Sequence, residues 1–239
     1  MLSLLRGLQC KICARTEQTI RLASAAQFRS QANDAALLGL DPLKDRFRAA
    51  AALWKTDVDR AVGELTPLAE AGSIWSMIYL GCAYRNGRGV PADRAKAELW
   101  FRRAFEAGSD NGLIYLGDLY ARANQYPKAS EILGVGAARN LAEAQWRLAH
   151  VMLRASESAP SLAEARRLLE RAATQGHLSA TRSLVTLLLR GRFGLRGRIE
   201  GVKLALDLMR SISTLERPAA ESIVSPPAEL VFDAPSAAI

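Results

Sequence analysis

The chain combines a length of 239 residues with a formal net charge of +8 and a hydrophobic content of 49%. Because no run of 18 apolar residues occurs, the composition argues against a membrane-spanning helix and predicts a soluble globular protein. The positive charge is unevenly distributed, since residues 1–33 carry +4 and residues 182–203 carry +5. These two segments are therefore candidates for contact with an acidic partner.

The N-terminal segment, residues 1–40, is basic and amphipathic in pattern. Within residues 1–33, five basic residues stand against the single acid Glu17, and leucines recur at roughly helical spacing. This composition is typical of a mitochondrial transit peptide, and also of a bacterial protein whose first helix is basic or lies on an anionic membrane surface. With the cysteine usage, it predicts an intracellular, reducing location, in which the bacterial cytoplasm is favoured slightly over the mitochondrial matrix.

Cysteine usage argues against several kinds of site. The three cysteines, Cys10, Cys13 and Cys82, are too few and too unevenly placed for a disulfide framework. Cys10 and Cys13 form a C-x-x-C pair without the second pair that would complete a zinc site, so no metal is predicted. Ala14 follows where a haem-attachment motif has histidine, and no cofactor is predicted.

Residues 76–108 contain the most informative pattern of the chain. Alanines at positions 61, 97, 129, 165 and 205 repeat at intervals of 36, 32, 36 and 40 residues. A period of this length predicts an all-α solenoid of about four to five helix–turn–helix repeats over residues 41–213. The residues that define the best-preserved repeat are Leu80, Gly81, Tyr84, Gly87, Gly89, Asp93, Ala97, Trp100 and Gly108.

This pattern closely resembles the Sel1-like repeat family, which is related to the tetratricopeptide repeats. The second unit keeps Leu116, Gly117, Tyr120 and Ala129, whereas the third and fourth units are more degenerate. The resemblance covers residues 46 to 212. It implies a right-handed α-solenoid that works as a non-enzymatic protein-binding scaffold or adaptor and helps to assemble or regulate a multiprotein complex. The chain lacks the paired cysteines that staple successive repeats in some members of the family.

Helix packing explains several repeat residues. Gly81 and Gly117 leave no bulk where the first helix of each pair passes close to the second. Asp57, Asp93 and Ser161 stand where a side-chain oxygen can cap the second helix, and Gly72, Gly108, Asn140 and Gly176 are expected to end helices. We expect helices at residues 46–55, 58–71, 74–86, 93–107, 110–123, 126–139, 141–155, 161–175, 177–190 and 200–212.

No catalytic constellation is predicted, and we expect that the protein is not an enzyme. The two histidines, His150 and His177, have no neighbouring Cys or Ser that would indicate an activated nucleophile. Most aromatic residues fall on repeat positions and indicate packing between helices. Trp75 and Tyr79 are expected to be partly exposed and are therefore candidate partner-binding residues.

The last repeat interval is the longest, and the extra residues coincide with a basic loop at residues 191–198. The candidate partner-binding residues here are Arg190, Arg192, Phe193, Arg196 and Arg198. Inserted loops of repeat proteins often form binding surface, so the loop favours a protein partner that is acidic in part. A loop that only keeps the last repeat soluble would show the same charge. The alternative function is binding of nucleic acid or anionic membrane through residues 1–33 and 182–203, although only Phe193 is available for base stacking.

Residues 214–239 differ from the repeats in composition. Four prolines, Pro218, Pro226, Pro227 and Pro235, stand among small and acidic residues. Such a segment cannot bury enough surface to offset the loss of chain entropy, which predicts a disordered tail. The apolar pair Ile223-Val224 and the run at residues 230–232 leave open a short docking peptide.

Overall fold

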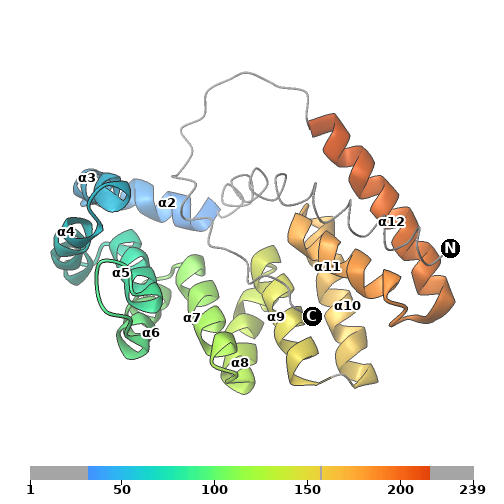
Figure 1. The fold of residues 1–239 in the computed structure, drawn as a ribbon. Coiled ribbons are helices and arrows are strands. Elements are labelled where there is room, and N and C mark those ends of the chain that lie inside the picture. Colours follow the sequence, from blue (N-terminus) through green and yellow to red (C-terminus); the bar gives the residue numbers. More distant parts are fainter. Residues whose placement is uncertain (1–31, 157, 216–239) are drawn as a thin grey trace. The chain divides into compact units, whose positions relative to one another are not determined.

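The computed structural model describes residues 32–156 and 158–215, so the cysteine pair near the N-terminus and the predicted tail from residue 216 lie outside the described residues. The described part contains eleven α-helices, one short 3-10 helix and no strand (Figure 1). This confirms the prediction of an all-α solenoid built from consecutive helix–turn–helix repeats. The described residues fall into two compact units, residues 32–171 and residues 172–215.

The first unit holds the repeats that match the sequence pattern best. From α3 to α9, each helix packs against the next one along the chain. Odd-numbered helices from α3 on are the first, or A, helices of the pairs, and even-numbered helices are the B helices. The elements are α2 (Ala32–Leu40), α3 (Lys44–Ala52), the 3-10 helix η1 (Leu53–Lys55), α4 (Val58–Glu70), α5 (Ile74–Asn86), α6 (Arg94–Glu106), α7 (Asp110–Arg122), α8 (Tyr126–Ala138), α9 (Ala142–Ala155) and α10 (Ala159–Thr174).

The described part of the second unit contains one helix pair. It consists of α11 (Leu178–Leu189) and α12 (Gly194–Leu215), which pack against each other. The basic loop is shorter than predicted, because α12 begins at Gly194 and not near residue 200. Arg196 and Arg198 therefore lie in the first two turns of a helix. The helix also extends through residue 215, past the predicted start of the tail.

The predicted helix boundaries are mostly confirmed by their capping residues. The Asp57 carboxylate accepts a hydrogen bond from the backbone N–H of Arg60 at 3.1 Å, and Asp93 accepts one from Lys96 at 3.0 Å. The prediction for Ser161 is wrong, because α10 begins two residues earlier and Ser158 accepts the N–H of Ser161. The predicted helix ends all have positive φ angles, at Gly72, Gly108, Asn140 and Gly176.

The aromatic residues of the first repeats are buried. The expectation that Trp75 and Tyr79 would be partly exposed is wrong, since their exposed fractions are 7% and 2%. The reason is that aromatic side chains of α3 and η1 pack against them. The centre of the Phe47 ring on α3 lies 5.3 Å from that of the Tyr79 ring, and the centre of the Trp54 ring on η1 lies 5.0 Å from it. Trp75 and Tyr79 therefore hold α3 and η1 against α5 and are not available to a partner.

Two helix pairs depend on glycines at their closest approach. A methyl group added at Gly81 on α5 would lie 2.6 Å from Cδ1 of Phe101 on α6. One added at Gly117 on α7 would lie 2.5 Å from Cγ of Leu133 on α8. Carbon atoms in contact normally stay about 3.5–4.0 Å apart. Both A helices therefore approach their B helices more closely than any residue other than glycine would allow at these positions, as predicted.

We predict that Gly81→Ala destabilises the repeats. The added methyl group must displace the buried Phe101 ring, and overpacking of this kind costs about 1–3 kcal/mol in the free energy of unfolding. Chemical denaturation followed by circular dichroism measures the change. The matched control is Gly63→Ala on α4, where an added methyl group meets no atom within 4 Å and should stabilise the helix by about 0.5–1 kcal/mol. Equal effects of the two changes would contradict the close crossing.

Candidate protein-interaction surface

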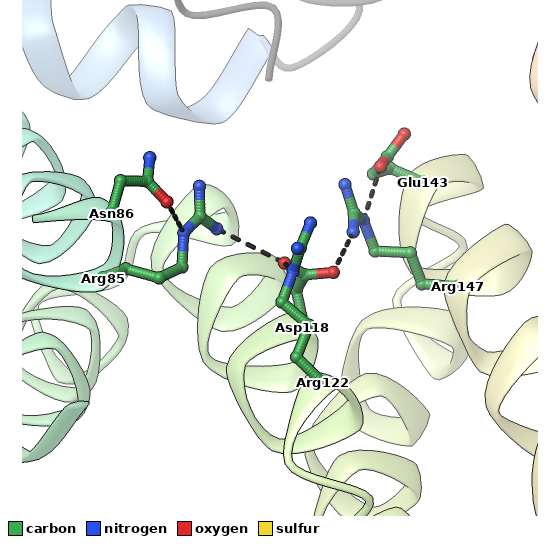
Figure 2. Close-up of polar contacts among 6 residues, drawn as sticks. All are labelled: Arg85, Asn86, Asp118, Arg122, Glu143 and Arg147. Atoms are coloured by element: carbon green, nitrogen blue, oxygen red, sulfur yellow. Dashed lines mark hydrogen bonds and ion pairs between the residues drawn. The ribbon is translucent and has the colours of Figure 1, made fainter. Parts of the chain in front are cut away.

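The A helices α5, α7 and α9 share a buried network of charged side chains (Figure 2). At its centre is Asp118 on α7, with an exposed fraction of 9%. Its carboxylate accepts hydrogen bonds from Arg122 at 2.7 Å and from Arg147 on α9 at 2.7 Å, and it pairs with Arg85 on α5 at 3.3 Å. Arg147 also pairs with Glu143 at 2.6 Å. One carboxylate thus links three successive repeats.

The network is held in its charged form. Burial alone would raise the pKa of Asp118, but the nearby Arg147, Arg122 and Arg85 outweigh it and hold the pKa below its usual value. Burial likewise opposes the charge on Arg147, whereas Glu143 and Asp118 raise the pKa of that guanidinium. The three arginines outnumber the two carboxylates. We call the side of α5, α7 and α9 that carries these residues the A-helix face. This part of it therefore keeps a net positive charge at neutral pH.

The Arg85 side chain is fixed on its apolar side as well. Its guanidinium lies 5.8 Å from the centre of the Phe101 ring and 5.6 Å from that of Tyr115. Such contacts between a cation and an aromatic ring are worth more when water is excluded. The same Phe101 ring closes the helix crossing at Gly81, so the charge network and the close packing of α5 on α6 depend on one side chain.

Helix α2 already occupies part of the A-helix face. It contacts both α5 and α7, and its ribbon passes above the charge network in Figure 2. The Asn33 side chain donates hydrogen bonds to the backbone oxygen of Gly108 at 3.0 Å and to the Asp110 carboxylate at 3.3 Å. Asp110 also pairs with Arg139 at 3.4 Å. The ends of the A helices thus offer polar groups that can recognise a chain segment lying across them.

A second group of side chains on α9 adjoins the network. The Trp146 ring lies 5.2 Å from the His150 ring in an edge-to-face arrangement, and the Arg147 guanidinium lies 5.3 Å from the Trp146 ring. All three side chains are half-buried. Tryptophan and arginine are the residue types that most often dominate binding energy at protein interfaces. This group therefore has the chemistry of a protein-binding site.

The structure places the predicted basic residues in the other unit. Arg190 ends α11, Arg192 and Phe193 lie in the turn before α12, and Arg196 and Arg198 lie on α12. The four arginines are exposed and Phe193 is half-buried. Their contact with a partner stays a prediction. The structure separates them into a turn and a helix face, whereas the sequence suggested one continuous loop.

The described residues offer little basis for metal or thiol chemistry. In residues 32–156 and 158–215, no group of three or more His, Cys, Asp or Glu side chains is placed to hold a metal ion. Cys82 is buried in α5 with a free thiol, and burial raises its pKa to about 12. None of the helices in this part of the chain is long and apolar enough to cross a membrane.

We predict that Asp118→Asn destabilises the protein strongly. The substitution keeps the shape of the side chain but removes the negative charge that Asp118 supplies to the buried ends of Arg85 and Arg147, and breaking a buried pair in this way costs about 3–5 kcal/mol. Since the folded pKa of Asp118 is lowered, its contribution is present above the unfolded pKa of about 3.9 and is lost as the pH falls through the lower folded value. The difference in unfolding free energy between parent and variant should therefore stay constant from about pH 5 to 8 and shrink below about pH 4.

The control for this prediction is Glu64→Gln on α4. Glu64 pairs with Arg60 at 3.0 Å, but both side chains are exposed, at 43% and 66%. Exposed pairs of this kind contribute about 0–1 kcal/mol. Urea denaturation at several pH values measures both variants. A loss at Asp118 no larger than that at Glu64 would contradict the central role of the network.

Comparisons with known proteins agree with this architecture. The model of the Sel1 repeat family matches residues 76–109 and 142–177. The crystal structure of a Sel1 repeat protein from Oxalobacter formigenes superimposes with a TM-score of 0.61 at 20% identity, over 77% of this chain and 74% of that chain. No curated protein gives a significant sequence match.

A second solved structure has the same fold. It is c5321, described as a protective antigen of uropathogenic Escherichia coli strains displaying an SLR fold, and it superimposes with a TM-score of 0.59 at 20% identity. The match covers 79% of this chain and 51% of that protein. The family model matches two repeats, and the two solved structures share the fold. The chain is therefore similar to the Sel1-like repeat family, with Sel1 repeats at residues 76–109 and 142–177.

Proposed function

We propose that this protein is a non-enzymatic scaffold that binds a segment of another protein on the A-helix face next to α2, over the part of α7 and α9 that carries the charge network and Trp146. Sel1-like repeats are generally protein-interaction modules. The observation that carries the proposal is α2, a helix that contacts α5 and α7 and whose Asn33 side chain is hydrogen-bonded to Gly108 and Asp110 at the start of α7. It is an example, within the chain itself, of the kind of ligand that this face accepts.

The charge network supports the proposal because it supplies a preorganised binding surface. Asp118 ties Arg85, Arg122 and Arg147 into one arrangement, so little side-chain entropy is left to lose when a partner binds. The Arg122 side chain is 44% exposed and is therefore accessible at the edge of the network. A partner segment with carboxylates would meet the net positive charge, and its apolar side chains would meet Trp146.

A binder of nucleic acid or anionic membrane remains the alternative interpretation of the basic segments. Exposed aromatic rings interleaved with cations would favour it. In the described part of the basic segment at residues 182–203, the aromatic residue is Phe193, which is half-buried. We therefore favour a protein partner and use nuclease treatment to separate the two interpretations.

We predict that Trp146→Ala reduces partner capture by about tenfold or more. Loss of an aromatic anchor at an interface typically costs at least 1–2 kcal/mol, and 1.4 kcal/mol corresponds to a factor of ten. The measurement is a pull-down from nuclease-treated extract of the native host, followed by quantitative mass spectrometry of the recovered proteins. Binding of one reproducible protein should fall in the variant while the circular dichroism spectrum keeps its helical form.

The matched control is Leu99→Ala on α6. Leu99 is an apolar side chain on a B helix with an exposed fraction of 47%, so its loss removes exposed apolar surface away from the A-helix face. It should leave recovery of the partner unchanged. Equal recovery with parent, Trp146→Ala and Leu99→Ala would remove the A-helix face from the binding surface. Recovery that disappears on nuclease treatment would favour the nucleic-acid interpretation.

A further inference from the structure

Helix α12 packs against α11 through a row of small residues. Gly197, Gly201 and Ala205 recur every four residues and are buried. A methyl group added at Gly201 would lie 2.8 Å from Cβ of Leu188 on α11, so the two helices approach closely along this row. This row of small residues therefore marks the side of α12 that packs against α11.

The other side of α12 exposes large apolar side chains. Leu195, Ile199, Val202 and Leu206 have exposed fractions of 74%, 53%, 40% and 42%. Their spacing of four, three and four residues is that of the a and d positions of a coiled coil, and the sequence continues it at Met209. We call Leu195, Ile199, Val202 and Leu206 the α12 stripe. A contiguous exposed apolar stripe that is flanked by polar residues indicates a docking surface.

Basic side chains flank the α12 stripe on both sides. With Ile199 at position a, the e positions are Arg196 and Lys203, and Arg198 is at a g position. All three are exposed. The sequence adds Arg210 at the next e position. Charges at e and g decide which helix a coiled coil accepts, because they face the corresponding positions of the partner.

The flanking charge argues against partners from the chain itself. A second copy of α12, in either orientation, would place basic residues against basic residues. Residues 1–33 carry +4 with the single acid Glu17, so they do not supply the acidic side chains that would complement these basic residues. Residues 216–239 are acidic, but their four prolines leave no run longer than residues 219–225 or 228–234 for a helix, and three heptads need about 21 residues.

We propose that the α12 stripe binds an acidic amphipathic helix of another protein in a coiled-coil-like pairing. The apolar a and d positions of that helix cover the stripe, and its glutamates or aspartates pair with Arg196, Arg198 and Lys203. This surface lies on a different unit from the A-helix face and extends the proposed scaffold to a second partner contact. The two proposals are independent, because each is tested on its own residues.

The test uses the full chain and two synthetic helical peptides of three heptads. Both carry leucine at every a and d position. One has glutamate at every e and g position and the other has lysine. Fluorescence anisotropy of labelled peptide measures the dissociation constants. The acidic peptide should bind at least about tenfold more tightly than the basic one, and its affinity should fall as the salt concentration rises.

Two sets of variants assign the binding to α12. The double variant Ile199→Ser and Val202→Ser should reduce the affinity for the acidic peptide by about tenfold or more, because apolar contact area is lost. Its matched control changes Leu99 and Val135, which are exposed to 47% and 37% on B helices, to serine and should leave the affinity unchanged.

The second set reverses the flanking charge. Arg196→Glu with Lys203→Glu should reverse the preference, so that the basic peptide binds more tightly. The control Arg46→Glu with Lys55→Glu makes the same change in net charge at exposed positions of α3 and η1 and should not reverse it.

Three results would overturn the proposal. The first is equal affinity for the two peptides. The second is a dimer of the parent chain in light scattering that Ile199→Ser with Val202→Ser converts to monomer, which would make a second copy the occupant. The third is binding that appears only after serine replaces Leu230, Val231 and Phe232, or Leu4, Leu5 and Leu8, which would make a segment of the chain the occupant. A negative result with Trp146→Ala affects none of these measurements.

Discussion

Close approach of each A helix to its B helix is the constraint on which the rest of the first unit depends. At Gly81 the Phe101 ring takes the place that a side chain would fill, and at Gly117 the Leu133 side chain does the same. A tight pair leaves one face of each A helix free of its B helix. That free face carries the charge network and holds α2. Packing on one side of the A helices thus determines what the other side can present to a ligand.

Burial of Asp118 is a consequence of this arrangement and not an isolated feature. A single carboxylate on a helix whose other positions are buried would be costly, and a charge is tolerated there only when it is fully paired. Arg85, Arg122 and Arg147 come from three successive A helices, so the pairing can form only when the repeats stack in register. The network therefore favours one stacking of the repeats over alternatives, besides shaping the surface.

The parts of the fold that depend on local contacts could be predicted from the sequence. Asp93 and Gly108 act within a turn of their own position, and their residue types determine what they do. The burial of Tyr79 could not be predicted, because it depends on Phe47 and Trp54 from the preceding, more degenerate pair. The sequence contained a signal for the charge network, but the repeat pattern made it easy to overlook. Asp118 with Arg122, and Glu143 with Arg147, are pairs four residues apart on A helices, and such pairs at otherwise apolar positions indicate a buried site.

Helix α12 shows why an exposed apolar face of a repeat protein must be interpreted differently from a packed one. In an internal repeat, an apolar position is explained by the next repeat, so hydrophobicity alone says nothing about function. Gly197, Gly201 and Ala205 lie on the buried side of α12, whereas Leu195, Ile199, Val202 and Leu206 are exposed and lack that explanation. Loop length and charge identified the arginines as candidate binding residues, but what they can bind depends on the helix that carries them. On a helix these arginines flank an apolar stripe. Neither the stripe nor the charge alone specifies a partner, but together they specify an acidic amphipathic helix.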